Sequence, residues 1–329
     1  MNQEEEVERF LVARGAQMLS MRRLAGGASQ ESWAVAVRTH EKNGDTHERE
    51  IVLRRDRGGA LSTLARTRTE EYVLMSKAYE AGVTVPQPLY EPLTLGGHGA
   101  FFMEYLPGET VGRRLVRDPK YQHARRVLPA QIIHTLAKLH AIDHTQFPFL
   151  GTPRTALDLV ATLEYDLDAC GEGHPAFELG LRWLRVNAAP LEHIRLVHGD
   201  FRMGNFVVDA DGLRGILDWE LTHVGDPVED LGWLCVRAWR FGSNQLPAAG
   251  IATRDQLLDL YQEAGGLAVT HRQLQYWELF GNVKWGIIAL SQAMRHLRGD
   301  ILDVELATLG RVAAEMELET LHLLSAMGA

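Results

Sequence analysis

The stretch from Leu196 to Asp218, LVHGDFRMGNFVVDADGLRGILD, constrains the fold of this 329-residue chain more than any other part of it. The run 195–197, at the start of this stretch, predicts a short strand. This strand is followed at 198–200 by a turn that a glycine makes possible, because glycine tolerates backbone conformations closed to other residues. The pattern predicts a strand that ends by presenting Asp200 in a turn.

A hairpin is predicted directly after this turn. The β-branched run 206–208 is followed by the sequence Asp-Ala-Asp-Gly at 209–212, which is typical of a hairpin turn, and then by the apolar run 213–217. Asn205 enters the first strand of this hairpin and Asp218 leaves the second. We therefore expect these two side chains to lie close together in space although 13 positions separate them in sequence.

The three polar side chains of this stretch have the chemistry that transfer of the terminal phosphoryl group of ATP requires. Asp200 can orient an attacking hydroxyl group and accept its proton, and Asn205 and Asp218 can hold the Mg²⁺ that bridges the phosphates. Magnesium is a hard cation that prefers oxygen ligands, which amide and carboxylate groups supply. The alternative for each residue alone is that it only caps a turn, as many Asp and Asn residues do.

The motif His-Gly-Asp-x-x-x-x-Asn at 198–205, followed by Ile-Leu-Asp-Trp-Glu at 216–220, resembles the aminoglycoside phosphotransferase and choline kinase family. The extension 217–234, LDWELTHVGDPVEDLGWL, is similar to one branch, the kinase-like domains associated with acyl-CoA dehydrogenases. The similarity runs from about residue 24 to residue 234. The remaining C-terminal part matches only in being helical.

This resemblance implies an α+β, protein-kinase-like fold with two lobes. It places a small, mainly antiparallel β lobe with one main helix at residues 1–106, where it binds nucleotide. A larger, mostly helical lobe at residues 107–329 carries the catalytic and acceptor-binding groups. The boundary lies within the sequence Leu-Pro-Gly at 106–108, which is typical of a turn.

The resemblance also implies roles for residues of the first lobe. A turn over the triphosphate corresponds to Gly26, Gly27 and Ser29, whose small size lets the backbone approach phosphate. The phosphate-binding lysine is replaced here by Arg54, with Arg55 as the alternative, and arginine is not equivalent to lysine because it is longer and planar. Glu71, or else Glu70, is expected to pair with Arg54.

Further roles are implied near the lobe boundary and the catalytic loop. Backbone groups of Glu104 and Leu106 are expected to hydrogen-bond adenine in the hinge. Asp230 is expected to hydrogen-bond the catalytic loop, and His198 and Asp226 are expected to support its shape. His134 and His140, both in a predicted helix at 131–143, are interpreted as ordinary helix residues and not as metal ligands.

Periodicity predicts the other elements. Strands are expected at 18–24, 32–37, 49–54 and 100–105, and helices at 4–14, 66–81, 228–239, 254–265, 277–294 and 303–324.

Composition limits the class of protein. A hydrophobic content of 46% and a charged content of 23% are those of a soluble globular protein, and the net charge of −9 argues against a nucleic-acid surface. The acidic start has no apolar segment of a secretion signal, and no run approaches a membrane span. Two distant cysteines, Cys170 and Cys235, indicate no disulfide framework. We therefore expect a cytoplasmic protein with no nucleic-acid or membrane partner; the oligomeric state is left open.

Two features bear on the acceptor. The stretch 112–126 carries six cations against the single acid Asp118, and it is either a solvated helix face or a patch for an anionic acceptor. Aromatic residues and one methionine recur in the C-terminal part at near-helical spacing, and they either pack the core or wall an acceptor pocket. The residues concerned are Tyr276, Trp277, Phe280, Trp285 and Met294, together with Trp219 and Trp239.

These observations favour a kinase that uses ATP and Mg²⁺ to phosphorylate a hydroxyl group of a small molecule. Only seven residues separate Asp218 from Asp226, which leaves no room for the long activation loop of a regulated protein kinase. The resemblance favours a hydroxyacyl-CoA or hydroxy acid as acceptor, with an aminoglycoside, a choline-like compound or a sugar alcohol as alternatives. Competing hypotheses are a catalytically silent nucleotide- or acyl-CoA-binding pseudokinase and a metal-dependent hydrolase.

Overall fold

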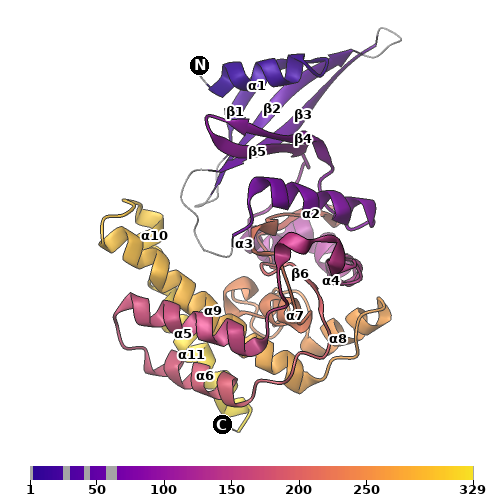
Figure 1. Ribbon diagram of the computed structural model, residues 1–329. Coiled ribbons are helices and arrows are strands. Elements are labelled where there is room, and N and C mark those ends of the chain that lie inside the picture. The colour runs from indigo at the N-terminus through magenta and orange to yellow at the C-terminus, as the bar shows by residue number, and fades with distance from the viewer. Residues whose placement is uncertain (1–2, 25–29, 41–44, 57–64, 329) are drawn as a thin grey trace. The chain divides into compact units, whose positions relative to one another are not determined.

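The computed structural model describes residues 3–24, 30–40, 45–56 and 65–328, and it divides the chain into two compact units. Unit 1 consists of Met1–Gly108 and Arg214–Thr222, and unit 2 consists of Glu109–Leu213 and His223–Ala329. The single boundary expected from the sequence did not foresee that residues 214–222 return to unit 1. Figure 1 shows the elements of both units.

Unit 1 is built on a five-stranded antiparallel sheet with the strand order β1-β2-β3-β5-β4. The sheet agrees with the expected fold class. Four of its strands cover the predicted ones, but β4 was not predicted. The strands are β1 (Ala16–Arg23), β2 (Gln30–His40), β3 (Thr46–Asp56), β4 (Pro88–Leu95) and β5 (His98–Glu104).

Helices α1 (Gln3–Val12) and α2 (Arg68–Glu80) cover opposite faces of this sheet (Figure 1). Successive side chains of a strand point to opposite faces, so Phe101 and Phe102 of β5 must reach different helices. The ring of Phe102 stacks on Phe10 of α1, 5.5 Å between centroids, whereas Phe101 meets Tyr72 of α2 edge to face at 6.0 Å. The sheet thus has a hydrophobic core on each side.

Residues 214–222 join unit 1 through backbone contacts. The N–H of Ile216 donates to the carbonyl of Thr84 over 2.9 Å, and the N–H of Arg66 donates to the carbonyl of Glu220 over 2.8 Å. Gly215 permits this approach, because a β-carbon there would lie 2.4 Å from Leu106 Cδ1. These contacts carry Asp218 into unit 1.

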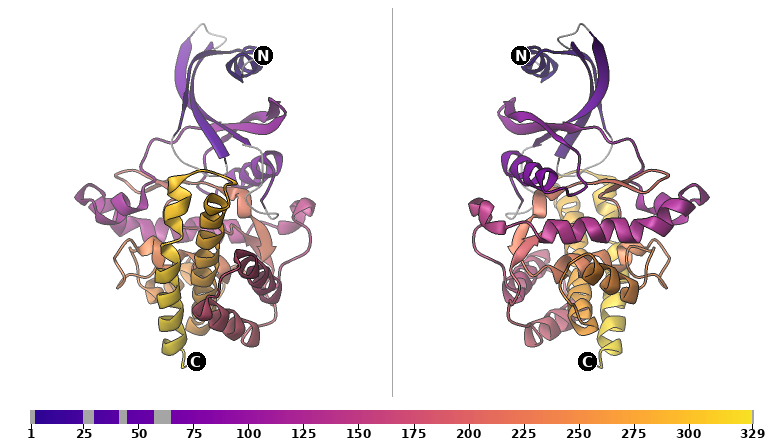
Figure 2. Two further views of the ribbon diagram at one scale, coloured as in Figure 1. Left: turned by 90° about the vertical axis from the view of Figure 1, so that its left-hand side faces the viewer. Right: turned by 90° about the vertical axis from the view of Figure 1, so that its right-hand side faces the viewer.

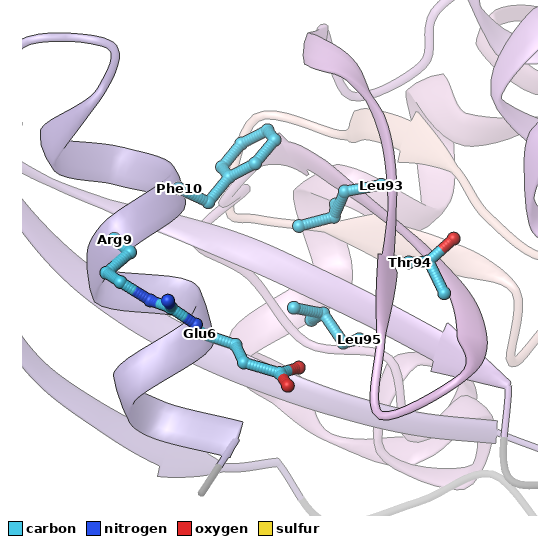
Figure 3. A pocket seen from close by; sticks show the side chains of 6 residues that line it. All are labelled: Glu6, Arg9, Phe10, Leu93, Thr94 and Leu95. Atoms are coloured by element: carbon cyan, nitrogen blue, oxygen red, sulfur yellow. The ribbon is translucent and has the colours of Figure 1, made fainter. Parts of the chain in front are cut away.

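A shallow depression in unit 1 lies between α1 and β4 (Figure 3). It lies on the α1 side of the sheet, opposite the side that α2 covers, and its floor is formed by apolar residues of the sheet core. Its lining residues are Glu6, Arg9 and Phe10 of α1 and Leu93, Thr94 and Leu95 of β4.

Unit 2 is mostly helical, as expected. Its long helix α9 packs against α5, α6, α7, α10 and α11, and Figure 2 shows α9 and α11 running side by side. The helices are α3 (Gly112–Arg117), α4 (Gln122–His140), α5 (Ala156–Cys170), α6 (Pro175–Val186), α7 (Val228–Leu234), α8 (Arg254–Glu263), α9 (His271–Leu297), α10 (Val304–Leu309) and α11 (Val312–Ala326). None of the described helices combines the length and apolar character that crossing a membrane requires.

Several helix boundaries differ from the sequence prediction. The helix expected at 131–143 begins at Gln122 and continues through Pro129, and α5 and α6 were not predicted. The helix expected at 228–239 ends at Leu234, because Val236 is extended, and a 3₁₀ turn follows at 237–240. The helix expected at 303–324 is divided at Gly310 into α10 and α11.

Short strands carry the predicted catalytic segment. Strand β6 (Arg195–Val197) pairs with β9 (His223–Gly225) in antiparallel register, Leu196 opposite Val224. Strands β7 (Phe206–Val208) and β8 (Leu213–Ile216) lie where the hairpin was predicted, and the N–H of Asp209 closes the turn onto the carbonyl of Gly212 over 3.0 Å.

Candidate active site

The loop between β6 and β7 holds Asp200 and Asn205 in unit 2. Its glycines Gly199 and Gly204 have φ values of 81° and 115°, a region that disfavours residues with a β-carbon. The sharp turns that these glycines allow bring the amide of Asn205 back to Asp200. The loop is therefore the product of a local sequence pattern.

The carboxylate of Asp200 accepts three side-chain hydrogen bonds within unit 2. Oδ1 accepts from Arg202 Nε at 2.9 Å and from Trp233 Nε1 at 2.8 Å, and Oδ2 accepts from Asn205 Nδ2 at 2.6 Å. Trp233 was not singled out in the sequence, because it lies 33 residues away on α7. The donors hold the carboxylate in one orientation while it stays partly accessible, with 13% of its side-chain surface exposed.

Asn205 is oriented by the same loop. Its amide nitrogen donates to Oδ2 of Asp200 and, over 3.0 Å, to the Asp200 backbone carbonyl. With the nitrogen engaged in this way, the oxygen is the amide atom left to meet a cation. Among the described residues, no group of three or more His, Cys, Asp or Glu side chains is arranged to hold a metal ion.

Asp230 of α7 anchors the start of the loop. It is fully buried and accepts from the backbone N–H groups of His198 at 2.8 Å and Gly199 at 2.9 Å. Its Oδ2 also lies 3.0 Å from His140 Nε2, and His140 Nδ1 lies 2.7 Å from the hydroxyl of Tyr261. His140 is thus part of the support of the loop, which corrects its interpretation as an ordinary helix residue.

His198 and Asp226 contact neighbouring backbone and ring groups. The buried ring of His198 accepts the N–H of Asp200 on Nδ1 at 3.3 Å. Asp226 accepts from the N–H of Val228 at 2.9 Å and from Trp277 Nε1 at 3.2 Å, which joins the start of α7 to α9. Burial raises the pKa of Asp226, and these two hydrogen bonds oppose the shift in part.

In unit 1, Arg54 on β3 lies between two carboxylates. Its Nη1 is 3.0 Å from Oε1 of Glu71 and its Nη2 is 2.9 Å from Oδ1 of Asp218. Arg54 is 5% exposed and Glu71 is fully buried. Burial alone would lower the pKa of Arg54, but the negative charges of Glu71 and Asp218 outweigh it and raise that pKa.

The alternatives for these positions make other contacts. Glu70 forms a capping box with Thr67 at the start of α2 and does not contact Arg54. Arg55 pairs with Glu31 of β2 at 2.6 Å and lies over the ring of Trp33. Glu71 instead contacts both Arg54 and Arg68, so two arginines balance its buried charge.

Asp218 itself has a left-handed backbone, with φ of 70°. Aspartate adopts this conformation more readily than most residues, yet it still stores strain, which in proteins clusters at functional sites. Elsewhere in unit 1, the N–H of Glu104 donates to the carbonyl of Gln87 over 2.8 Å. Gly26, Gly27 and Ser29 lie outside the described residues.

Comparison with known families decides the class of the protein. A model of the phosphotransferase enzyme family matches residues 20–267, about three quarters of the chain. The chain belongs to the phosphotransferase enzyme family. This is the family that the sequence motifs indicated.

Relatives of this phosphotransferase occur within larger proteins. It is 26% identical over 304 residues to acyl-CoA dehydrogenase family member 11 of Gallus gallus, covering 86% of the chain and 37% of that protein. It is 28% identical over 201 residues to acyl-CoA dehydrogenase family member 10 of Mus musculus, covering 57% of the chain and 18% of that protein. The phosphotransferase chain therefore spans well under half the length of these relatives.

Solved structures share its fold. A protein of Ralstonia eutropha described as an aminoglycoside phosphotransferase superposes with a TM-score of 0.72 at 18% identity, covering 98% of each chain. A thermostable aminoglycoside phosphotransferase in complex with AMP-PNP and hygromycin B superposes with a TM-score of 0.64 at 16% identity, covering 97% of this chain and 98% of its own. The expected protein-kinase-like fold is confirmed.

The structure distributes the predicted site residues of this phosphotransferase over both units. Asp200, Asn205, His198, Asp226 and Asp230 belong to unit 2, while the residues expected to bind nucleotide and Asp218 belong to unit 1. The expected approach of Asn205 to Asp218 therefore joins the two units and stays a prediction.

Half of the cations in the stretch 112–126 pair with other groups of unit 2. Arg114 pairs with Glu109 at 3.0 Å, Arg117 donates to the carbonyl of Phe241 at 2.7 Å, and Arg125 donates to the carbonyls of Leu115 and Asp118. These contacts favour a structural part for half of the six cations over an open patch for an anion.

The C-terminal aromatic residues mainly pack helix α9. Tyr276, Trp277 and Phe280 are buried, the hydroxyl of Tyr276 donates to the carbonyl of Leu184, and Trp285 lies 4.9 Å from Trp239 between ring centroids. Trp219 belongs to unit 1, whereas the other aromatic residues belong to unit 2.

Proposed function

We propose that this phosphotransferase uses ATP and Mg²⁺ to phosphorylate a hydroxyl group of a hydroxyacyl-CoA or a hydroxy acid. The observation that carries the proposal is the carboxylate of Asp200, which is oriented by three donors and remains partly accessible in a protein of this family. A carboxylate held in this way can orient an acceptor hydroxyl and take its proton as the oxygen attacks phosphorus.

Each unit supplies one oxygen donor of the kind that magnesium prefers. The amide oxygen of Asn205 and the carboxylate of Asp218 are hard oxygen donors, and Mg²⁺ in kinases is usually held by one or two protein groups together with substrate phosphates. Held by such groups and by the phosphates, the ion would neutralise charge on the phosphates during transfer. The other steps of the proposal use side chains of the chain itself.

Arg54 would hold the nucleotide phosphates, with Glu71 fixing the guanidinium. The ion pair of 3.0 Å and the burial of both partners support this assignment over Arg55, which is paired with Glu31. The carbonyl of Glu104 and the N–H of Leu106 would hydrogen-bond adenine. The fold neighbour crystallised with AMP-PNP supports an adenine nucleotide as donor.

The acceptor is inferred from local chemistry and from the relatives. An aminoglycoside is a polycation and calls for acidic groups, whereas the side chains that donate to the Asp200 carboxylate are the cation of Arg202, the amide of Asn205 and the indole of Trp233. The guanidinium of Arg202 lies 4.6 Å from the Trp239 ring centroid. An anionic or neutral acceptor with an apolar part suits this surface better. The acyl-CoA dehydrogenase relatives favour an acyl-CoA or its parent acid.

The test is a screen for phosphorylated product. The purified chain is incubated with MgATP and a panel of hydroxyacyl-CoA thioesters, hydroxy acids, sugar alcohols, choline and aminoglycosides, and mass spectrometry records the gain of one phosphate. We expect product with an acyl or acid acceptor. Nucleotide binding without any product would favour the silent pseudokinase, and phosphate release without an acceptor would favour a hydrolase.

Replacing Arg54 should separate nucleotide binding from the chemistry. Arg54→Met removes the charge that faces the phosphates, and we expect KM for ATP to rise about tenfold, a loss of about 1.4 kcal/mol of binding. Arg54→Lys should lose less, because it keeps the charge but not the planar fork. Arg55→Met is the matched control and should leave KM for ATP near the wild-type value. The reverse result would assign phosphate binding to Arg55.

A further inference from the structure

A half-buried lysine of the long helix α9 reaches the loop that carries Asp200 in unit 2. Lys284 lies on α9, outside the residues that the family model matches, and no motif or periodicity singled it out. Its Nζ donates to the backbone carbonyl of Gly199 at 3.3 Å and lies 3.2 Å from Oε1 of Glu229. It therefore contacts the residue that directly precedes Asp200.

Close packing of α9 on α7 makes this reach possible. A β-carbon at Gly232 of α7 would lie 2.4 Å from the backbone carbonyl carbon of Trp277, and one at Gly281 of α9 would lie 2.6 Å from Val236 Cγ2. Only residues without a side chain allow the helices to come this near. The lysine on this face of α9 is thereby brought within hydrogen-bond distance of the loop.

A second link runs from Lys284 to Asp200 through Trp233. The ammonium group lies 4.6 Å from the centroid of the Trp233 ring, within the range of a cation–π interaction. The same indole donates its Nε1 hydrogen to Oδ1 of Asp200 over 2.8 Å. One side chain thus contacts both the backbone before the catalytic carboxylate and the ring that fixes one of its oxygens.

The charge of Lys284 is balanced in this setting. Glu229 is buried and is held by Lys284 and by His223, whose Nε2 is 3.0 Å from Oε2. Burial would raise the pKa of Glu229, but the interactions with His223 and Lys284 lower it to about 2. A lysine that is paired in this way stays at the loop and keeps its position.

We propose that Lys284 is a positioning residue, which holds Gly199 and the Trp233 indole so that the carboxylate of Asp200 faces the acceptor. The proposal rests on the proposed role of Asp200. It does not place Lys284 in contact with substrate, so its loss should change the rate of phosphoryl transfer and not the affinity for nucleotide.

Kinetics of two replacements test this role, with the acceptor that the metabolite screen selects. For Lys284→Met we expect kcat to fall about 10- to 100-fold, the range found when a residue supporting a site is lost, while KM for ATP changes less than about twofold. Lys284→Arg should recover much of the rate, because it keeps the charge near the ring. Arg272→Met, a matched change at the exposed start of α9, should behave as wild type.

Loss of Lys284 also leaves the buried carboxylate of Glu229 without one of its partners, which lowers stability independently of the loop. Removing the charge of Glu229 as well separates this effect from the effect on the loop. The double replacement Lys284→Met/Glu229→Gln takes away both charges, and we expect it to regain stability without regaining kcat. A double variant with wild-type kcat would overturn the proposal, because the rate would then follow the buried charge and not the position of the loop.

The indole resonance of Trp233 gives a test that needs no acceptor. In two-dimensional ¹H–¹⁵N spectra, assigned by loss of the signal in Trp233→Phe, the Trp233 indole N–H should shift and exchange faster in Lys284→Met, whereas that of Trp183 should not. An unchanged Trp233 signal would overturn the proposal. If the wild-type chain phosphorylates no acceptor, the proposed function fails, while this spectrum still decides whether Lys284 holds Trp233.

Discussion

Replacing Asp200 with asparagine is expected to lower kcat by roughly 10²- to 10⁴-fold, the contribution of a well-placed general base. The amide cannot accept the proton of the acceptor hydroxyl. It also presents N–H groups to a site where Arg202, Asn205 and Trp233 already donate, so its single oxygen cannot satisfy all three. Both effects act on the chemical step. The rate of product formation, followed by mass spectrometry, is the measurement.

Nucleotide affinity is the internal control for this replacement. Asp200 is proposed to contact the acceptor and not ATP, so titration calorimetry should give a Kd for MgATP within about twofold of wild type. Asp211→Asn makes the same chemical change at an exposed hairpin position and should leave kcat unaltered. A kcat for Asp200→Asn within about threefold of wild type would remove Asp200 from the role of proton acceptor.

The parts of the site that the sequence predicted are those with local signals. The turns at 198–200 and 209–212 follow from glycine and from short-range hydrogen bonds, and both lie where expected. The choice of Arg54 came from the family resemblance, which left Arg55 open as the alternative. Alternate residues of a strand face opposite sides of a sheet. Only one of the two can reach α2, and in the structure Arg54 does so.

The parts of the site that the sequence did not predict depend on contacts between residues far apart in the chain. His140 meets Asp230 and Tyr261, which are 90 and 121 residues away, and Lys284 meets Gly199, which is 85 residues away. The partners of a histidine or lysine on an amphipathic helix cannot be predicted from the sequence, since periodicity indicates only which face is buried. The same limit applies to residues 214–222, whose return to unit 1 rests on Thr84 and Arg66.

Several predicted helix boundaries were wrong for a different physical reason. Proline inside a helix removes one hydrogen bond and usually ends or bends it, yet α4 continues through Pro129, so tertiary packing of its buried face outweighs the local penalty. The opposite happens at Gly310, where an apolar pattern that fits one long helix is divided in two. Local helix propensity sets a helix boundary only where tertiary packing favours neither alternative.

Replacing Asp230 with alanine is expected to destabilise the protein and to lower kcat together. The buried carboxylate satisfies the N–H groups of His198 and Gly199, and leaving two buried donors unpaired costs about 2–6 kcal/mol at about 1–3 kcal/mol each. The free energy of unfolding is measured with denaturant, and kcat is measured at a temperature where the variant is folded. The fall in kcat should persist there, because these two N–H groups set the shape of the loop that carries Asp200.

Asparagine at the same position separates packing from hydrogen bonding. Asp230→Asn keeps the volume and one acceptor oxygen, so we expect a loss of stability between those of wild type and Asp230→Ala. His140→Phe removes the third donor to this carboxylate, and its effect should be smaller in the Asp230→Asn background than alone, because the two residues act through one contact. Full stability of Asp230→Ala would contradict the anchoring role. A destabilised variant with wild-type kcat would show instead that the loop keeps its catalytic shape without Asp230.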